Sequence, residues 1–272
     1  MSVPSGADWG FRSSVDLGFT EQSIVDEHFQ ACRAEYLGLL ARVPVTEGAH
    51  MLDAGCGAGA FLPALADLVG AGGRITAVDL APEHVKAVGD LTLPCPLDVR
   101  VADLRALPLA DDSVDVAWCS NVVQYLDDDA LDRALAELRR VVRPGGTVAI
   151  KELDASSITV RPADPFLVVD FFRSAAVRDG YARQLLRSRD LHHHLADAGF
   201  EAVAQRTVLI ERYGPLDPAS RRYFGRACAD LARQAGGRGD WARFLSADDH
   251  PLDSPRAYAC EGAVLAVGTV PA

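Results

Sequence analysis

Short apolar runs and amphipathic segments alternate along this chain. The runs at 74–80 (RITAVDL) and 114–120 (VDVAWCS) have the length and composition of buried strands. The segment 128–142 instead repeats its apolar residues at helical spacing, and it begins with acids and ends with arginines, as the helix dipole favours. Strands that alternate with helices in this way predict an α/β fold.

The same pattern predicts the order of the elements. After an irregular arm over residues 1–20, we expect a helix from Thr20, which can cap it, until Pro44 stops it. Further helices are expected over 82–89, 128–142 and 188–198. Strands are expected at 51–53, 74–80, 98–104 and 114–120, after the Pro-Gly-Gly turn at 144–146, and at 202–212 and 258–269. The segments 156–186 and 213–256 are left as insertions that cap the fold.

The stretch 50–61 (HMLDAGCGAGAF) combines a strand, a glycine turn and a helix start. Glycines at 55, 57 and 59 let the backbone approach a ligand closely, which is typical of a nucleotide site. The spacing also satisfies the dinucleotide fingerprint, with Ala60 in its third place, so the glycines alone leave two cofactor classes open. Asp53 favours the other class, because a carboxylate at the strand end repels a pyrophosphate and attracts an ammonium group.

Two later strands also end in acids. Asp79 follows Gly59 by about twenty residues, where a ribose-binding acid is expected in either cofactor class. Asp103 and Leu104 end the next strand. This spacing supports an adenosine-containing ligand.

Taken together, these features resemble the class I S-adenosylmethionine-dependent methyltransferases, of the small-molecule type that includes ubiquinone and menaquinone methyltransferases. The resemblance rests on D-x-G-x-G-x-G at 53–59, on the strand-end acids, and on the runs LPLADDSVDVAWCSNVVQYL and LAELRRVVRPGGTVAI. It implies a Rossmann-like α/β sheet of seven strands with the last antiparallel, helices on both faces, and helical cap insertions. It also implies a methyltransferase domain over 45–272, preceded at 1–44 by an N-terminal arm and a covering helix.

The resemblance also implies a cofactor site. In that family the first acid lies beside the amino group of the ligand, the second binds the ribose, and the third takes the adenine amine. The residues expected to bind S-adenosylmethionine, and its product S-adenosylhomocysteine, are Arg33, Asp53, Gly55, Gly57, Gly59, Asp79, Leu80, Asp103, Leu104 and Asn121.

Composition limits the partners. A formal net charge of −11 disfavours a nucleic-acid substrate, since such proteins usually carry a basic stripe. No metal site is expected, because the six cysteines form no C-x-x-C pair and the histidines at 192–194 fan out around a helix. We find no stretch apolar enough to span a membrane and no secretion signal, so a cytoplasmic location is expected. The expected partners are a small-molecule acceptor and, as one option, a second copy of the chain in a homodimer.

The two insertions hold eight of the chain's nineteen aromatic residues, which predicts an apolar pocket for the acceptor. These residues are Phe166, Phe171, Phe172, Tyr181, Tyr223, Phe224, Trp241 and Phe244. Three residues on elements that border the pocket mouth are candidate bases, namely His28, Glu152 and His250.

The reaction implied is methyl transfer to oxygen, nitrogen or carbon of a small, apolar or aromatic metabolite, as in natural-product or quinone biosynthesis. A second hypothesis is that the scaffold binds S-adenosylmethionine and catalyses a cyclisation or elimination without methyl transfer. A third, a nicotinamide-dependent oxidoreductase, is disfavoured by Asp53, Asp103 and the Pro-Gly-Gly turn.

Overall fold

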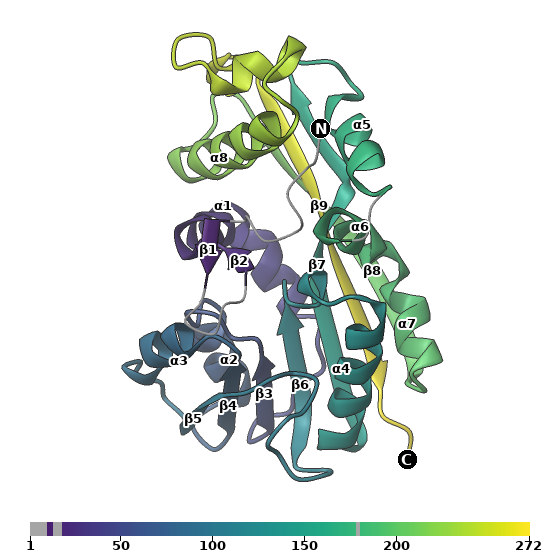
Figure 1. Ribbon diagram of the computed structural model, residues 1–272. Helices are drawn as coiled ribbons and strands as arrows, with labels where there is room; N and C mark the ends of the chain where they lie inside the picture. Colours follow the sequence, from purple (N-terminus) through teal and green to yellow (C-terminus); the bar gives the residue numbers. More distant parts are fainter. Residues whose placement is uncertain (1–9, 13–17, 178–179) are drawn as a thin grey trace.

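The computed structural model describes residues 10–12, 18–177 and 180–272. Its central sheet has the strand order β5-β4-β3-β6-β7-β9-β8 (Figure 1). The strands are β3 (His50–Ala54), β4 (Arg74–Asp79), β5 (Leu97–Val101), β6 (Val114–Ser120), β7 (Val142–Arg161), β8 (Glu201–Tyr213) and β9 (Tyr258–Thr269). Strands β3 to β7 are parallel, whereas β9 is antiparallel to both of its neighbours. This confirms the predicted seven-stranded sheet with an antiparallel last strand.

Helices cover both faces of the sheet because successive strand residues point to opposite sides. Met51 packs into one apolar core together with α1 (Gln22–Leu40) and α2 (Leu62–Val69), and α3 (Pro82–Gly89) contributes Val88. The next residue, Leu52, packs into a second core with α4 (Asp128–Val141) and α7 (Leu191–Asp197). None of the helices in the described ranges is long and apolar enough to cross a bilayer.

Strands β7, β9 and β8 extend past the others and carry a cap (Figure 1). The pairing of β7 with β9 runs from Thr147↔Thr269 to Arg161↔Tyr258, with a register shift between Asp154 and Thr159. Helices α5 (Leu167–Ala175) and α6 (Tyr181–Leu186) form one part of the cap. Helix α8 (Pro218–Gln234) forms the other, followed by the short 3-10 helices η3 (Gly239–Leu245) and η4 (Pro251–Asp253).

Several predicted boundaries are wrong. Within the arm, which was expected to be irregular, β1 (Gly10–Arg12) pairs antiparallel with β2 (Gly18–Thr20), while 1–9 and 13–17 lie outside the described residues. Thr20 therefore ends a strand, and Glu21 is the N-cap residue of α1. The first expected insertion begins as a continuation of β7. The helix expected at 188–198 is divided into η2 (Arg187–Asp190) and α7.

The parallel register brings the strand ends together. Asp53 of β3 lies opposite Ala77 of β4 and Trp118 of β6, so the loops after these strands begin at the same edge of the sheet. The glycine turn, Asp79 and Asn121 all lie in these loops or at these ends. Residues far apart in sequence thus meet at one site.

The Pro-Gly-Gly segment 144–146 lies within β7, which begins at Val142, and not before the strand as predicted. Its two glycines give a matched pair of substitutions. A Cβ atom on Gly146 would lie 2.6 Å from the Asp115 carbonyl oxygen and 2.8 Å from that of Arg143, whereas one on Gly145 would meet nothing within 4 Å. Gly145 has φ +74°, so Gly145→Ala should cost about 1–2 kcal/mol from backbone strain alone. We expect Gly146→Ala to cost more, because two backbone oxygens must move. Urea unfolding measures both variants, and equal losses would contradict this packing.

Candidate functional site

A cavity of about 1260 Å³ lies at the carboxyl edge of the parallel strands, between the glycine turn and the cap. Its wall is formed by α1, the turn after β3, the ends of β4 and β6, and helices α6 and α8. Ligands of open α/β sheets bind at this edge. Single-ligand sites usually enclose roughly 300–1,000 Å³, so this cavity has room for two ligands side by side.

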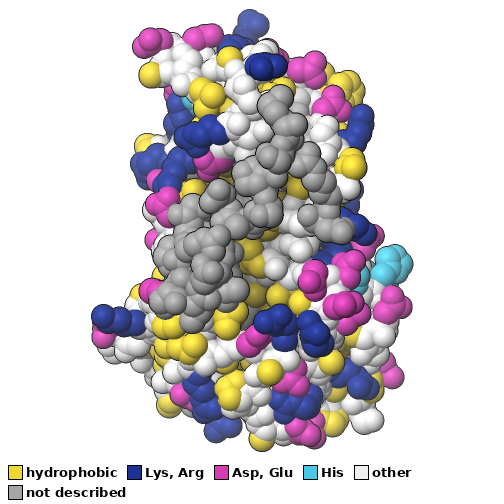
Figure 2. Space-filling view, viewed as in Figure 1, with side chains coloured by type: hydrophobic (Ala, Val, Ile, Leu, Met, Phe, Trp, Pro, Cys, Tyr) yellow, Lys and Arg dark blue, Asp and Glu magenta, His cyan; other side chains and the backbone are white. Residues whose placement is uncertain are grey.

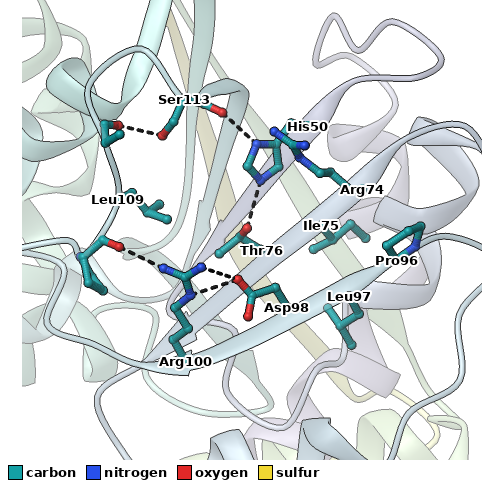
Figure 3. A pocket seen from close by; sticks show the side chains of 12 residues that line it. His50, Arg74, Ile75, Thr76, Pro96, Leu97, Asp98, Arg100, Leu109 and Ser113 are labelled. Atoms are coloured by element: carbon teal, nitrogen blue, oxygen red, sulfur yellow. Dashed lines mark hydrogen bonds and ion pairs between the residues drawn. The ribbon is translucent and has the colours of Figure 1, made fainter.

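A smaller hollow of about 420 Å³ lies at the opposite edge, where β3, β4 and β5 begin (Figure 3). The two ring nitrogens of His50 lie 2.7 Å from the Ser113 carbonyl oxygen and 2.8 Å from Thr76 Oγ1. Arg100 donates to Asp98 Oδ2 at 2.6 Å. These polar groups are already bonded within the protein, and the hollow lies at the amino edge. We therefore place the functional site at the carboxyl edge.

The glycine turn is built from three left-handed residues. Gly55, Gly57 and Gly59 have φ values of +86°, +52° and +85°. The Gly57 amide donates to Asp79 Oδ2 at 2.9 Å, which ties the turn to the next strand. A Cβ atom on Gly55 would overlap the Val122 side chain, whereas one on Gly57 would meet nothing within 4 Å. Gly57 therefore presents open backbone to the cavity, as the sequence predicts for a ligand cradle.

Asp53 is a buried carboxyl that faces the same cavity. It is 3% exposed, and within the part of the chain that the structure describes it has no hydrogen-bond or ion-pair partner. Burial, reinforced by the charge of Asp79, raises the pKa of Asp53 to about 8. A cationic group in the cavity would stabilise its ionised form. The predicted contact with a ligand ammonium group therefore has a physical basis in this site.

Asp79, at the end of β4, is hydrogen-bonded to the glycine turn that follows β3. Its Oδ1 accepts from the Ala81 amide at 2.9 Å and lies 3.0 Å from His84 Nδ1. This hydrogen bond raises the pKa of His84. Asp79, Leu80 and His84 all line the cavity. The predicted ribose-binding acid is thus at the site, although part of its hydrogen-bonding capacity is used within the protein.

Asp103 and Leu104 also line the cavity, as predicted. Strand β5 ends at Val101, two residues before the predicted acid, so Asp103 lies in the following turn. Arg105 donates to Asp103 Oδ1 from Nε at 2.9 Å and to Oδ2 from Nη2 at 2.6 Å, and its hydrogen bonds lower the pKa of that carboxyl. An adenine amine would share Asp103 with Arg105, a residue that sequence reasoning missed.

Asn121 begins the loop after β6 and lines the cavity, as predicted. Its φ is +58°, a left-handed conformation that asparagine tolerates better than most residues. Its side-chain oxygen accepts from Lys151 Nζ at 2.9 Å, and its amide donates to the Lys151 carbonyl oxygen at 2.8 Å. Lys151 therefore fixes the shape of this loop.

Glu152 lies outside the cavity wall, so its position does not support the predicted role as a base. It is 1% exposed and is not part of the cavity wall. Its Oε1 accepts the amides of Val122 at 2.8 Å and Val123 at 2.9 Å, which supports the loop that continues into η1 (Val123–Tyr125). Burial raises its pKa to about 7. Its other oxygen, Oε2, is buried and has no hydrogen-bond partner among the described residues.

Three further predicted residues lie on or near the cap. Arg33 is exposed on α1 and lies outside the cavity wall, so its predicted cofactor contact is not supported by its position. His250 lines the cavity, but its Nδ1 accepts the Leu252 amide at 3.2 Å and so caps η4. Burial lowers the pKa of His250. His28 also lines the cavity, on α1.

Sequence reasoning missed two buried charged residues beside His28. Lys151 is fully buried, and Glu261 of β9 is 1% exposed. Glu261 accepts from His28 Nε2 at 2.6 Å and from the Tyr223 hydroxyl at 2.7 Å. A lone acid within the apolar run 259–267 is the signal that identifies Glu261. Its partners carry no such signal, because His28 is 233 positions away in the sequence.

The sequence matches a methyltransferase domain model over residues 52–150. An uncharacterised 37.1 kDa protein in transposon TN4556 of Streptomyces fradiae is 36% identical over 193 residues, which cover 70% of this chain and 54% of that protein. A malonyl-[acyl-carrier protein] O-methyltransferase of Pseudescherichia vulneris is 38% identical over 133 residues, or 49% of this chain and 50% of the relative. The chain thus spans about half the length of each of these relatives.

The fold also matches solved structures. A SAM-dependent methyltransferase from Aquifex aeolicus superposes with a TM-score of 0.53 and 20% sequence identity, over 91% of this chain and 99% of the other. At this identity the likeness concerns the fold.

The burial of Asp53 has a consequence for stability. Its pKa in the folded protein, about 8, lies above its ordinary value, so the folded state resists an ionisation that the unfolded chain allows. The wild type should therefore lose stability as pH rises from about 4 to 8. We expect Asp53→Asn to unfold at a higher urea concentration than the wild type. The difference between their midpoints should grow from about pH 4 to 8 and then level off. A margin independent of pH would contradict a buried, unpartnered carboxyl.

Proposed function

We propose a methyl-transfer function for this chain, which belongs to the class I S-adenosylmethionine-dependent methyltransferases. The matched domain model and the solved methyltransferase structure confirm the predicted resemblance and cofactor, and the strand order confirms the predicted sheet. The proposed reaction is methylation of oxygen, nitrogen or carbon on a small acceptor that is largely apolar or aromatic. The observation that carries the proposal is that one cavity continues from the glycine turn to the aromatic residues of the cap.

The carboxyl-edge end of the cavity fits S-adenosylmethionine. Asp53 supplies an unpartnered carboxylate for the ammonium group, and Gly57 supplies open backbone. Asp79 and Asp103 supply acceptors for the ribose hydroxyls and the adenine amine. When bound, the cofactor supplies an electrophilic methyl group on a positive sulfur. The protein then has to align the acceptor with that methyl group and exclude water.

The cap end of the cavity is apolar and aromatic. Four of the eight aromatic residues predicted for the pocket line it, namely Phe172, Tyr181, Tyr223 and Phe244. The other four do not: Phe224 and Trp241 are buried elsewhere, Phe171 packs on Trp241, and Phe166 is 61% exposed. Leu153, Ile158 and Leu185 add aliphatic surface to the wall. Such a lining favours an apolar body in the acceptor over a sugar or an amino acid.

The relative from Pseudescherichia vulneris is named for a malonyl acceptor, which carries a carboxylate. Arginines of α8 gather on the surface in Figure 2, and all four of them, Arg221, Arg222, Arg226 and Arg233, also line the cavity. They are paired with acids: Arg221 donates to Asp253 at 2.6 Å, and Arg226 donates to Glu27 at 3.2 Å. Their charges are thus compensated within the protein. This pairing favours a neutral acceptor here over a malonyl group.

Cyclisation or elimination without methyl transfer stays the second hypothesis. It differs from methyl transfer in one measurable product, because it forms no S-adenosylhomocysteine. The homodimer and the cytoplasmic location remain predictions from the sequence.

An acceptor screen with methyl-labelled S-adenosylmethionine tests the proposed function. The panel contains phenols, quinols, terpenoid alcohols, amines, amino acids, sugars and malonyl thioesters. We expect label transfer to an apolar or aromatic member, with S-adenosylhomocysteine formed in equal amount. Transfer to polar acceptors alone would contradict the apolar pocket. Turnover of an acceptor without S-adenosylhomocysteine would favour the second hypothesis.

Cofactor binding should release a proton from Asp53. Its pKa of about 8 keeps it mainly protonated at neutral pH, while a bound ammonium group favours the ionised form. We expect S-adenosylhomocysteine to bind more tightly as pH rises from about 6 to 8, with up to tenfold per pH unit. Calorimetry in two buffers of different ionisation enthalpy measures the released proton. Asp53→Asn should bind more weakly and release none, and an unchanged affinity would remove Asp53 from the site.

Phe172 tests the acceptor end of the cavity. It is 4% exposed and lines the wall, so Phe172→Ala should raise the KM for the best acceptor of the screen by about tenfold, the scale of a lost apolar contact. The control is Phe166→Ala, in the same segment but exposed and outside the cavity. Both variants should bind S-adenosylhomocysteine as the wild type does. An unchanged KM in Phe172→Ala would place the acceptor elsewhere.

A further inference from the structure

A cluster of buried polar side chains lies where the cap meets the sheet. Glu261 stands in β9 among apolar neighbours, and a buried carboxylate is costly unless charges and donors surround it. His28 and Tyr223 donate to it, and the Cys32 thiol lies 3.4 Å from its Oε1. Burial alone would raise the pKa of Glu261, but His28, Tyr223 and Lys151 together lower it. Glu261 is therefore ionised, and it acts as an acceptor.

This carboxylate fixes the orientation of His28. The ring stacks on Tyr223 with centroids 4.1 Å apart and planes at 9°. Because Glu261 can only accept, the Nε2 atom that lies 2.6 Å from it carries the proton. The Tyr36 hydroxyl lies 2.6 Å from the same nitrogen. Nδ1 then holds the free lone pair, and it has no partner among the described residues.

Lys151 balances the charge of the cluster. Its Nζ lies 3.2 Å from the centroid of the Tyr36 ring, and its positive charge stabilises Glu261. Burial lowers the pKa of Lys151 to about 8, and Glu261 opposes that shift. Lys151 thus compensates part of the charge of Glu261. A neutral imidazole is the form that can accept a proton.

We propose that His28 is the catalytic base of this site, with its Nδ1 as the accepting atom and Glu261 as its positioning residue. The inference rests on the proposed methyl transfer. His28 lines the cavity with a side chain 13% exposed, and Nδ1 is its ring nitrogen without a partner among the described residues. Tyr223 and Tyr36 hold the ring from two further sides.

The proposed methyl transfer is a nucleophilic displacement at the methyl carbon. The acceptor's O–H or N–H proton passes to Nδ1 of His28, and the electron pair released forms the bond to the methyl carbon. The bond from that carbon to sulfur breaks with its pair on sulfur, which leaves S-adenosylhomocysteine and a protonated His28. The proton then returns to solvent through the cavity.

A base of this kind narrows the acceptor class. A carboxylate has already lost its proton at neutral pH and needs no base. A phenol, an alcohol or a protonated amine does need one. The acceptor is therefore a hydroxyl or amine compound with an apolar body. This class differs from the malonyl acceptor after which the relative is named.

The same atoms offer an alternative that the test has to separate. Ligand atoms of His28, Cys32 and Glu261 lie within 4.8 Å of one another, close enough to hold a metal ion. Burial raises the pKa of the Cys32 thiol far above its ordinary value, and Lys151 adds a positive charge beside the cluster. Both effects oppose a bound cation.

Four variants test the base. His28→Asn removes the basic nitrogen, Glu261→Gln removes the charge that orients it, and Tyr223→Phe removes one hydrogen bond while keeping the stacked ring. His193→Asn, on the exposed side of α7, is the matched control. S-adenosylhomocysteine affinity and the far-UV circular dichroism spectrum report whether each variant keeps the fold and the cofactor end.

The kinetic probe is the phenol or amine with the highest rate in the acceptor screen, compared with a nitro-substituted analogue that ionises more readily. We expect His28→Asn to lose about 10²–10⁴-fold in kcat with the parent acceptor, and to recover most of that loss with the analogue. Glu261→Gln should lose less, and Tyr223→Phe less again. The control should match the wild type with both acceptors.

The pH profile gives a second readout. The kcat of the wild type and of His28→Asn should depend on pH in different ways, because only the wild type has the imidazole. Other ionisable groups of the cluster and the nearby wall are Glu27, Cys32, Tyr36, Lys151, Arg222, Tyr223, Arg226 and Glu261. Lys151, with its pKa of about 8, would act on the alkaline side.

The outcomes separate the two proposals. If the wild type forms no S-adenosylhomocysteine with any acceptor, the proposed function fails and the base falls with it. If the wild type methylates only carboxylates, or if His28→Asn keeps its kcat with the parent acceptor, only the base assignment is overturned. Stoichiometric metal that is lost in Cys32→Ser, together with loss of activity on chelation, would also overturn it in favour of a metal site.

Discussion

The length of three strands determines the shape of this molecule. Strands β7, β9 and β8 extend beyond the parallel part of the sheet, and apolar surface on a sheet has to be covered. Four helices cover this surface, namely α1, α5, α6 and α8, and they come from separate parts of the sequence (Figure 1). The carboxyl edge of the shorter strands then forms the floor of the cavity under this cover. The proposed cofactor and acceptor sites are thus two ends of one cavity.

Three buried carboxyl groups, those of Asp53, Glu152 and Glu261, differ in the groups that surround them. Asp53 has a free carboxyl and faces the cavity, so its environment suits a cationic ligand. Glu152 is bonded to two backbone amides and supports a loop. Glu261 is surrounded by donors and a lysine charge, and it orients a histidine. The three acids have similar burial, so only their surroundings distinguish the roles that we propose for Asp53 and Glu261 from the supporting role of Glu152.

The part of the fold set by local pattern could be predicted from sequence. The helix at 82–89 and the strand-end acids Asp53 and Asp79 lie where their periodicity and spacing placed them. The sequence-based predictions fail where contacts between residues far apart in the sequence determine the structure. Nothing local indicates that β7 continues to Arg161, because its partner is β9, about a hundred residues later. Glu152 looked like a strand-end acid at the pocket, but its neighbours turn it toward backbone amides. The partners of Glu261 come from α1 and α8, which only the folded chain brings together.

The proposed function requires a cofactor that binds at the carboxyl edge of the sheet, next to the cap. Hydrogen exchange with and without S-adenosylhomocysteine measures this directly, since exchange reports local opening of the backbone. We expect protection at 53–59 and at 121–125, together with α1, where the cavity wall passes from sheet to cap. Protection at the opposite edge, around 74–76 and 97–100, or no protection at any of these segments, would contradict it.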